Sequence, residues 1–310
     1  MATSVFIDGE AGTTGLQIRE RLAGRADLQL ETIDPDKRKD PSARAEILND
    51  VDVAILCLPN AAAEESVGLI NSNTTRVIDA STAHRVHPEW AYGFPEMSPA
   101  QRESIRASAR VSNPGCYPQG LIATVRPLID AGLLAPNFPV TYHAISGYTG
   151  GGKQMIADYE NNAAAKPYFP YGLNFAHKHV PEMTEYSGLV AAPVFEPAVG
   201  NYAQGMLCSV PLHPAALGRA VTAAELYDLL AARYQDEPFI KIFSAEETAA
   251  DDLSPERWND SNMMALHVFA NDSTGQAALI AVYDNLGKGA SGAAVQNLNL
   301  MIGAAETEGL

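Results

Sequence analysis

The first 80 residues alternate short apolar runs with helix-forming segments, and this alternation constrains the possible folds most strongly. Apolar runs typical of buried strands occupy residues 5–8, 28–33, 53–58 and 76–80. Helical patterns occupy residues 16–23 and 61–70 between them. The run at 53–58 is apolar throughout, as in a strand covered on both faces. Strand–helix–strand alternation predicts an α/β, doubly wound parallel sheet of the Rossmann type.

A different pattern begins near residue 135, where strands become more frequent than helices. We expect strands at residues 140–145, 188–192, 205–210, 239–243, 263–269 and 277–283. One clear helix is predicted over 222–234, opened by a capping box of Thr222 and Glu225. This half of the chain predicts an α+β domain with a mixed or antiparallel sheet, and residues 291–302 predict a helix that returns to the first domain.

Three glycines lie in the first strand-to-helix turn, as Gly9-x-x-Gly12-x-x-Gly15. Glycines there let the backbone approach a pyrophosphate, and the helix N-terminus that follows supplies N–H donors. The spacing differs from GxGxxG, but its position in a βαβ chain favours a dinucleotide site. The second strand is followed by Asp34-Pro-Asp-Lys37-Arg38-Lys39, whose basic side chains can bind the 2′-phosphate of NADP. A solvated charge run is the alternative interpretation.

Cys116 is the strongest candidate for a nucleophile. Pro114-Gly115 predicts a turn before it, and Pro118 suits the first turn of a helix. A thiol at a helix N-terminus faces unpaired N–H groups and the positive end of the helix dipole, which stabilise the thiolate. Cys57 and Cys208 lie within predicted apolar strands, and we interpret both as core residues.

Other polar groups are candidates for proton transfer and substrate binding. The segment His177-Lys178-His179 precedes Glu182, and in a strand both histidines would lie on one face. Arg85 follows the strand at 76–80, near the sheet edge where ligands bind in such folds. A glycine-rich loop at 146–153 either cradles a phosphate or is simply flexible.

Charge and cysteine content exclude several classes of partner. A formal net charge of −16 disfavours nucleic acid and anionic membranes as partners. No apolar run approaches the roughly 20 residues of a membrane span, and the first residues show no signal peptide. Three cysteines without zinc-site spacing predict a reducing, cytoplasmic location and no metal site.

Six segments together resemble the N-acetyl-γ-glutamyl-phosphate reductase family, and most closely its shorter form. They lie at residues 7–18, 55–59, 79–85, 112–117, 177–182 and 284–289, and they extend over nearly the whole chain. The segment Ser112-Asn-Pro-Gly-Cys-Tyr117 is the most specific. Gln119 departs from the usual threonine, and the residues before Arg85 differ from the Ser-Ala-Asp-Phe-Arg that is common in the longer form.

The resemblance implies NADPH-dependent reduction of an acyl phosphate through a Cys116 thioester, in arginine biosynthesis. It implies His179 or His177 as the acid/base and active-site roles for Arg85 and Glu182. The predicted NADP-binding residues are Gly9, Gly12, Thr13, Thr14, Gly15, Arg38, Leu58, Pro59, Ser81, Gly150, Asn285 and Lys288. The predicted division is an NADP-binding domain (1–116), a catalytic and oligomerisation domain (117–284) and a returning C-terminal helix (285–310). A homodimer or homotetramer is the expected assembly.

Three other functions stay open at this stage. An aspartate-semialdehyde dehydrogenase-like enzyme would take a different acyl phosphate, and a carrier-linked glutamyl-phosphate reductase would need a basic docking surface. A non-catalytic NADP-binding sensor would have no need for an activated cysteine.

Overall fold

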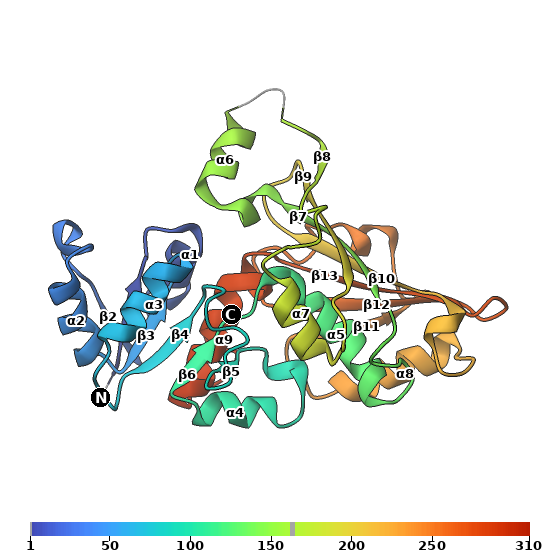
Figure 1. Cartoon of the computed structure of the whole chain (residues 1–310), viewed down its shortest axis with the longest axis horizontal. Helices are drawn as coiled ribbons and strands as arrows, with labels where there is room; N and C mark the ends of the chain where they lie inside the picture. Colours follow the sequence, from blue (N-terminus) through green and yellow to red (C-terminus); the bar gives the residue numbers. More distant parts are fainter. Residues whose placement is uncertain (1, 162–164) are drawn as a thin grey trace. The chain divides into compact units, whose positions relative to one another are not determined.

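A computed structural model describes residues 2–161 and 165–310 (Figure 1). The chain forms two compact units. The first comprises the described residues up to Pro114 together with Ala290–Leu310, and the second comprises Gly115–Gly289. None of the helices in the described residues is both long and apolar enough to cross a bilayer.

The first unit is built on a six-stranded sheet in the order β2-β1-β3-β4-β6-β5, with every neighbouring pair parallel. Its strands are β1 (Thr3–Asp8), β2 (Leu28–Glu31), β3 (Val53–Leu56), β4 (Arg76–Asp79), β5 (Ala91–Tyr92) and β6 (Arg110–Ser112). Its helices are α1 (Thr13–Leu22), α2 (Pro41–Asp50), α3 (Asn60–Leu69), α4 (Gln101–Ala107) and α9 (Gly292–Ile302), with short 3-10 turns η1 (Pro35–Lys37) and η2 (Pro95–Met97).

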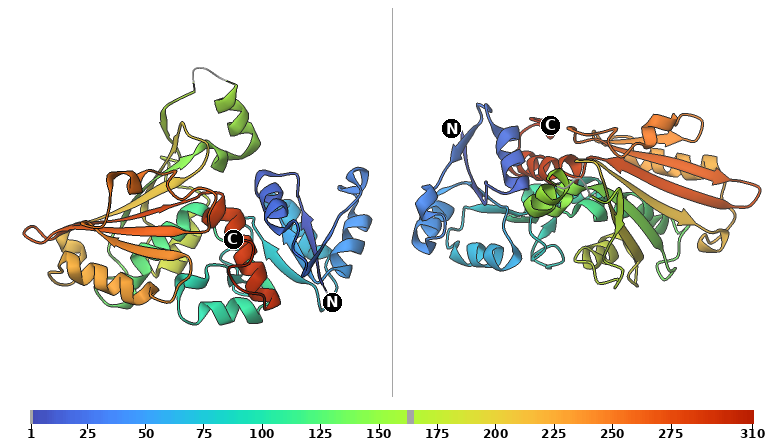
Figure 2. Two further views of the ribbon diagram at one scale, coloured as in Figure 1. Left: turned by 180° about the vertical axis from the view of Figure 1, so that it is seen from behind. Right: turned by 90° about the horizontal axis from the view of Figure 1, so that it is seen from above.

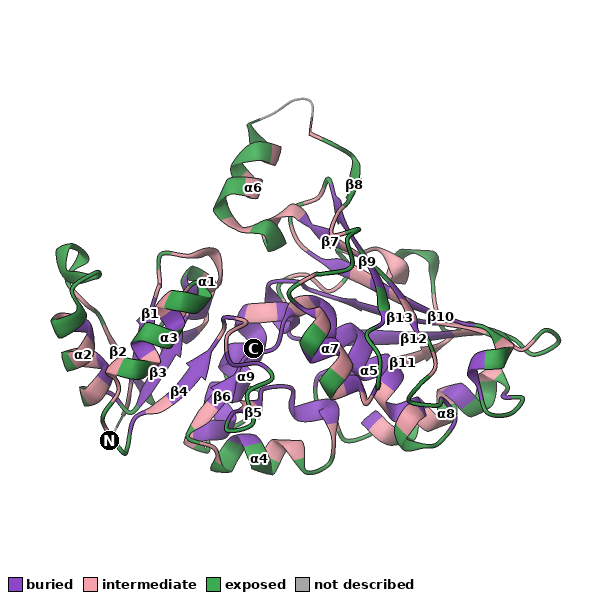
Figure 3. Ribbon diagram, viewed as in Figure 1, coloured by how far each residue is buried: buried purple, intermediate pink, exposed green. Residues whose placement is uncertain are grey.

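Helices cover both faces of this sheet because successive strand residues point to opposite sides. Val5 and Ile7 pack into a cluster with residues of α1, α4 and α9, whereas Phe6 packs into a second cluster with α2 and α3. Figure 2 shows the helices on the two sides of these strands, and Figure 3 shows α9 as almost wholly buried. The predicted doubly wound parallel sheet is confirmed.

The second unit contains a seven-stranded mixed sheet in the order β11-β12-β13-β10-β7-β9-β8. Its strands are β7 (Thr141–Gly147), β8 (Tyr168–Pro170), β9 (Val194–Gly200), β10 (Met206–Leu212), β11 (Ile240–Ser244), β12 (Met264–Asn271) and β13 (Gln276–Tyr283). Its helices are α5 (Cys116–Asp130), α6 (Gly152–Glu160), α7 (Val180–Ser187) and α8 (Ala223–Tyr234), with 3-10 turns η3 (Tyr148–Gly151), η4 (Pro214–Ala216) and η5 (Ala250–Leu253). A π-helical turn, η6 (Gly287–Ser291), follows β13. The predicted mixed sheet is confirmed.

Helices α5 and α8 cover one face of the mixed sheet. Helix α5 packs on β10 and β13, and α8 packs on β11 and β12. The Tyr234 hydroxyl at the end of α8 donates to the carbonyl of Ala123 in α5 at 2.8 Å. The predicted capping box opens α8, with Thr222 as N-cap and Glu225 reaching back to its N–H.

One predicted strand is absent, and the strand considered for the histidine pair does not form. Residues 188–192 are not a strand: Gly188 ends α7 in a left-handed conformation (φ +80°), and β9 begins only at Val194. His177 and His179 do not share a strand face, because they lie in the turn before α7 and His179 is its N-cap. The apolar residues of 188–192 are typical of a strand, but the glycine at position 188 is a signal for the C-terminus of a helix.

Candidate active site

The glycine turn after β1 has the geometry that only glycine permits. Gly9 has φ +90°, and a Cβ atom there would lie 2.4 Å from the Cys57 carbonyl oxygen. A Cβ at Gly15 would lie 2.6 Å from the Gly9 carbonyl oxygen. Gly12 is the N-cap of α1, so Thr13 and Thr14 form the first turn of that helix. The turn therefore brings backbone close to the N-terminus of α1, as a bound pyrophosphate requires.

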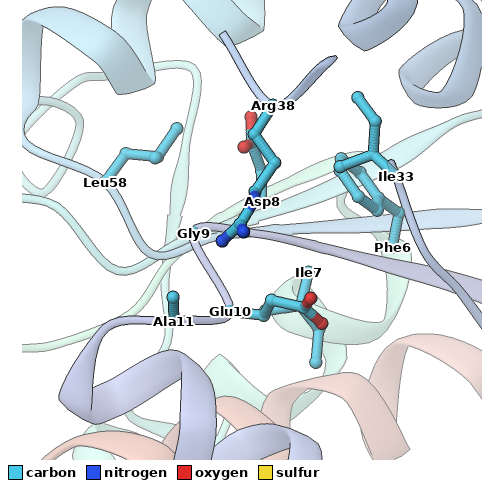
Figure 4. A pocket seen from close by; sticks show the side chains of 9 residues that line it. All are labelled: Phe6, Ile7, Asp8, Gly9, Glu10, Ala11, Ile33, Arg38 and Leu58. Carbon is cyan, nitrogen blue, oxygen red and sulfur yellow. The ribbon is translucent and has the colours of Figure 1, made fainter. Parts of the chain in front are cut away.

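A pocket opens beside this turn, lined by Phe6, Ile7, Asp8, Gly9, Glu10, Ala11, Ile33, Arg38 and Leu58 (Figure 4). The Arg38 side chain points into the pocket. The predicted cofactor residues Gly9, Arg38 and Leu58 are thus brought together, and Pro59 follows as the N-cap of α3. A guanidinium near the end of β2 is placed where the 2′-phosphate of NADP binds in this fold class.

A buried ion pair, which no sequence pattern indicated, holds the end of β1 before the glycine turn. Arg44 of α2 lies 3.0 Å from the Asp8 carboxylate, and the Ser66 hydroxyl of α3 donates to the same carboxylate oxygen at 2.9 Å. Asp8 and Arg44 are each 6% exposed, and Ser66 is fully buried. Because this carboxylate is neutralised by Arg44, it does not leave an isolated negative charge beside the pocket.

Ser81 and Arg85 lie in a tightly bonded loop after β4. The Ser81 hydroxyl donates to the Asp79 carboxylate at 2.7 Å, and Nδ1 of His84 lies 2.6 Å from the same carboxylate oxygen. The Arg85 guanidinium is buried and donates to the carbonyls of Ala80 (3.1 Å) and Asn113 (3.0 Å). Arg85 therefore fastens the segment that leads into the Cys116 helix.

Cys116 is the first residue of α5, with Gly115 as the N-cap. Its side chain therefore lies at the positive end of the α5 dipole. The backbone N–H of Gly115 donates to Oε2 of Glu182 at 3.1 Å, and Glu182 is 1% exposed. Glu182 thus contacts the turn that carries the thiol, an arrangement that spacing alone does not reveal.

The two histidines gather around the aromatic ring that follows Cys116. The rings of His177 and His179 each lie 5.9 Å from the Tyr117 ring, and 4.8 Å from each other. Nδ1 of His177 accepts the backbone N–H of His179 at 3.2 Å. His179 is 6% exposed, and His177 is half-buried. The structure therefore places Glu182 and both histidines against the two residues that flank Cys116, Gly115 and Tyr117.

Three predicted cofactor residues lie elsewhere in the second unit. A Cβ at Gly150 would lie 3.3 Å from Nδ2 of Asn285, and Oδ1 of Asn285 accepts the Gly205 N–H at 2.7 Å. Lys288 is fully buried, with its ammonium 5.6 Å from the centre of the Phe239 ring. These contacts connect the segments around β7, β10, β11 and β13.

The other two cysteines differ from Cys116 in their surroundings. Burial raises the pKa of Cys57 to about 12, reinforced by the negative charges of Asp79 and Asp8. Burial likewise raises the pKa of Cys208 to about 12. Both therefore stay protonated at neutral pH. Cys208 is a buried core residue of β10, as expected, whereas Cys57 lies just after β3 and is half-buried. Within the described residues, no group of His, Cys, Asp or Glu side chains is arranged to hold a metal ion.

Two family models match the chain. The one described as the NAD binding domain of semialdehyde dehydrogenase matches residues 5–105, and the one described as its dimerisation domain matches residues 116–285.

Curated relatives are similar over nearly their whole length. The N-acetyl-gamma-glutamyl-phosphate reductase of Chelativorans sp. (strain BNC1) is 55% identical over 307 residues, which cover 97% of this chain and 99% of that protein. The protein of the same name from Mesorhizobium japonicum is 52% identical, covering 98% of this chain and 100% of that protein.

Solved structures show the same fold at much lower identity. Aspartate semialdehyde dehydrogenase from Francisella tularensis has a TM-score of 0.74 and 12% identity, covering 97% of this chain and 100% of that one. Aspartate semialdehyde dehydrogenase II from Vibrio cholerae has a TM-score of 0.72 and 17% identity, covering 97% and 98%.

Proposed function

The chain belongs to the N-acetyl-γ-glutamyl-phosphate reductase family, and we propose that it catalyses the NADPH-dependent reduction of N-acetyl-5-glutamyl phosphate. The products are N-acetyl-L-glutamate 5-semialdehyde and inorganic phosphate, and the reaction belongs to arginine biosynthesis. The observation that carries this proposal within the structure is a cysteine at the first position of α5, whose two neighbours contact a buried glutamate and a buried histidine: Gly115 donates to Glu182, and the Tyr117 ring lies against His179.

The cofactor turn fits a dinucleotide phosphate. A Cβ at Gly9 or Gly15 would overlap neighbouring backbone, so glycine allows the tight turn that leads to the N–H groups at the start of α1, where a pyrophosphate can bind. Arg38 supports NADP over NAD, because only NADP has a 2′-phosphate for it to bind. When bound, NADPH supplies the hydride that reduces the acyl group. The remaining cofactor contacts at Thr13, Thr14 and the residues of the second unit are proposed on the resemblance.

Cys116 acts as the nucleophile in this scheme. Its thiolate attacks the acyl carbonyl carbon, and the carbon–oxygen bond to phosphate breaks with both electrons leaving on phosphate. The product of this step is a thioester on Cys116. After the acyl carbon has been reduced, the carbon–sulfur bond breaks, which releases the aldehyde and restores the thiolate. The N-terminal N–H groups of α5 stabilise negative charge on the sulfur.

We assign the proton transfer to His179 rather than His177. Nδ1 of His177 accepts the His179 backbone N–H, so this nitrogen is engaged in the turn and the ring proton of the neutral form lies on Nε2. Protonation of Nδ1 would break that turn contact. His179 donates a proton to the oxygen that develops negative charge and takes it back when the carbon–sulfur bond breaks.

Glu182 and Arg85 have positioning roles in this scheme. The Glu182 carboxylate accepts the N–H of Gly115, the residue that precedes Cys116 in the chain. Arg85 holds the carbonyl of Asn113, three residues before Cys116. The alternative for Arg85, a bidentate clamp on the substrate carboxylate or phosphate, stays a prediction of the sequence.

We further propose that 1–116 binds NADP, that 117–284 carries the catalytic groups and the oligomer interface, and that the protein is a cytoplasmic homo-oligomer. Helices cover one face of the mixed sheet, whereas the opposite face carries exposed or half-buried side chains such as His143, Ile145 and Leu207. The match to a dimerisation domain over 116–285 supports pairing through this unit. Light scattering after gel filtration measures the assembly, and a monomer at micromolar concentration would contradict it.

The reaction can be tested in reverse, as phosphate-dependent reduction of NADP by N-acetylglutamate semialdehyde. Aspartate semialdehyde and glyceraldehyde 3-phosphate serve as competing substrates in the same assay. We expect a clear preference for the first, abolished in Cys116→Ser with NADPH binding retained. A preference for aspartate semialdehyde would reject the substrate, and full activity of Cys116→Ser would reject the thioester.

A further inference from the structure

A tyrosine hydroxyl is inserted at the first turn of the helix that begins with Cys116. Tyr283 is the last residue of β13 and is fully buried. Its hydroxyl donates to the carbonyl oxygen of Cys116 at 2.6 Å and accepts the N–H of Gly120 at 3.0 Å. In an α-helix these two backbone groups, four residues apart, are each other's ordinary partners. The hydroxyl therefore bridges the hydrogen-bond pair that closes the first turn.

The surroundings are built to accept this hydroxyl. A Cβ at position 120 would lie 2.9 Å from the Tyr283 hydroxyl oxygen, so glycine leaves the space that the tyrosine occupies. The pKa of Tyr283 is raised well above its ordinary value, chiefly by burial, so the hydroxyl keeps its proton and remains a donor to Cys116. The Cys208 thiol lies 3.6 Å from the same oxygen.

The chain that follows Tyr283 also contacts Cys116. The Gly289 N–H donates to the Asp284 carbonyl at 2.8 Å, which folds the π-helical turn back on β13. A Cβ at Gly289 would lie 2.9 Å from the Cys116 Cβ, so the Gly289 backbone packs closely against the base of the Cys116 side chain. Cys116 is thus contacted on its carbonyl side and on its Cβ by consecutive parts of one segment, residues 283–289.

We propose that Tyr283 is a positioning residue for the nucleophile, holding the first turn of α5 so that the Cys116 thiol is aimed at the acyl carbon. Its contacts with α5 are to the backbone groups of Cys116 and Gly120, so it acts through the orientation of Cys116. This inference rests on the proposed role of Cys116 as the nucleophile. A displacement of about 1 Å at a reacting group can lower a rate about a hundredfold, so one hydroxyl at this position has a measurable effect.

The test compares Tyr283→Phe with Tyr234→Phe. Both tyrosines are buried, and both hydroxyls donate to a carbonyl of α5, but Tyr234 binds Ala123, two turns beyond Cys116. Two readouts are taken: kcat and KM for the reductase reaction, and the rate at which iodoacetamide alkylates Cys116 as a function of pH. Cys116→Ser supplies the background from the other thiols.

For Tyr283→Phe we expect kcat to fall about tenfold to a hundredfold with KM for NADPH unchanged, and alkylation to be slower or shifted to higher pH. Tyr234→Phe should retain both properties. Wild-type values in Tyr283→Phe, or equal losses in the two variants, would overturn the proposal. If Tyr283→Phe does not fold, Gly120→Ala disturbs the same hydroxyl from the helix side and should shift alkylation in the same direction. If the wild-type protein has no reductase activity, the proposed function is rejected. A difference in Cys116 alkylation between wild type and Tyr283→Phe would in that case still support the positioning role of Tyr283.

Discussion

Gly120→Ala is expected to destabilise the protein, although alanine in a helix interior is ordinarily about 1 kcal/mol more favourable than glycine. A Cβ at this position would lie 2.9 Å from the hydroxyl oxygens of both Tyr142 and Tyr283. Both tyrosines are fully buried, and their hydroxyls donate to the carbonyls of Tyr117 and Cys116 at 2.6 Å. The added methyl group must therefore displace two rings from hydrogen-bonded positions.

The expected magnitude follows from two opposing effects. Overpacking of a core costs about 1–3 kcal/mol, and a buried hydrogen bond left unmade adds about 1–3 kcal/mol. After subtraction of the helix gain of about 1 kcal/mol, the net loss in the free energy of unfolding is about 1–5 kcal/mol. Each kcal/mol lowers Tm by about 2–4 °C in a unit of this size, so the middle of the range, about 3 kcal/mol, corresponds to about 9 °C.

Gly68→Ala is the matched control, since Gly68 lies in α3 and a Cβ there meets open space among the described residues. This variant should gain about 0.5–1 kcal/mol. Thermal unfolding followed by circular dichroism measures both variants against the parent chain. A Tm for Gly120→Ala at or above that of the parent would refute the reasoning, because it would mean that the tyrosine rings have room to move.

Three further predictions concern stability. Thr222→Ala removes the capping box of α8 and should lower the free energy of unfolding by about 1 kcal/mol. Thermal unfolding measures this loss, and an unchanged Tm would contradict it. Burial lowers the pKa of His267 below its usual 6.5, so stability should decrease as pH falls from about 6.5 to that lowered pKa, by at most ~1.4 kcal/mol per pH unit. Urea midpoints of His267→Gln should depend less on pH in that window, and an equal slope would contradict this. Arg44→Met leaves the Asp8 carboxylate buried without its cation and should cost about 3–5 kcal/mol, which Asp8→Asn in the same chain should largely restore. Urea denaturation of the four chains measures this coupling, and additive effects would reject it.

The first unit was predictable because its central strands are buried on both faces. A strand such as β3 has four buried residues in succession, and that continuous apolar run is visible without any structure. The glycine turn was predictable for a related reason, since Gly9 and Gly15 occupy positions where a Cβ would overlap the backbone. Both features can be recognised from residue type alone: a continuous apolar run indicates burial on both faces, and glycine indicates a position without room for a Cβ.

The second unit was harder, and the histidine pair shows why. The sequence His177-Lys-His179 alternates in the way a strand would, but Pro181 and Glu182 occupy the first turn of α7. Proline and an acidic residue at these positions are signals of a helix start, and they outweigh a two-residue alternation. The helix-start signal therefore predicts His179 as the N-cap of α7 and places His177 and His179 in the turn before that helix.

Positioning residues were missed for a deeper reason. Cys116 could be found from sequence because its chemistry resides in its own side chain. Tyr283 lies 167 residues further along the chain and binds the carbonyl of Cys116, a group that every residue possesses. No pattern of side chains marks which backbone group a distant hydroxyl will contact; only the packing of β13 under α5 decides it. If Tyr283 sets the reactivity of Cys116, a chain can keep every residue of the Ser112–Tyr117 segment and still lose activity through a change in β13. The alkylation measurement on Tyr283→Phe tests this directly, because that variant leaves the cysteine segment intact.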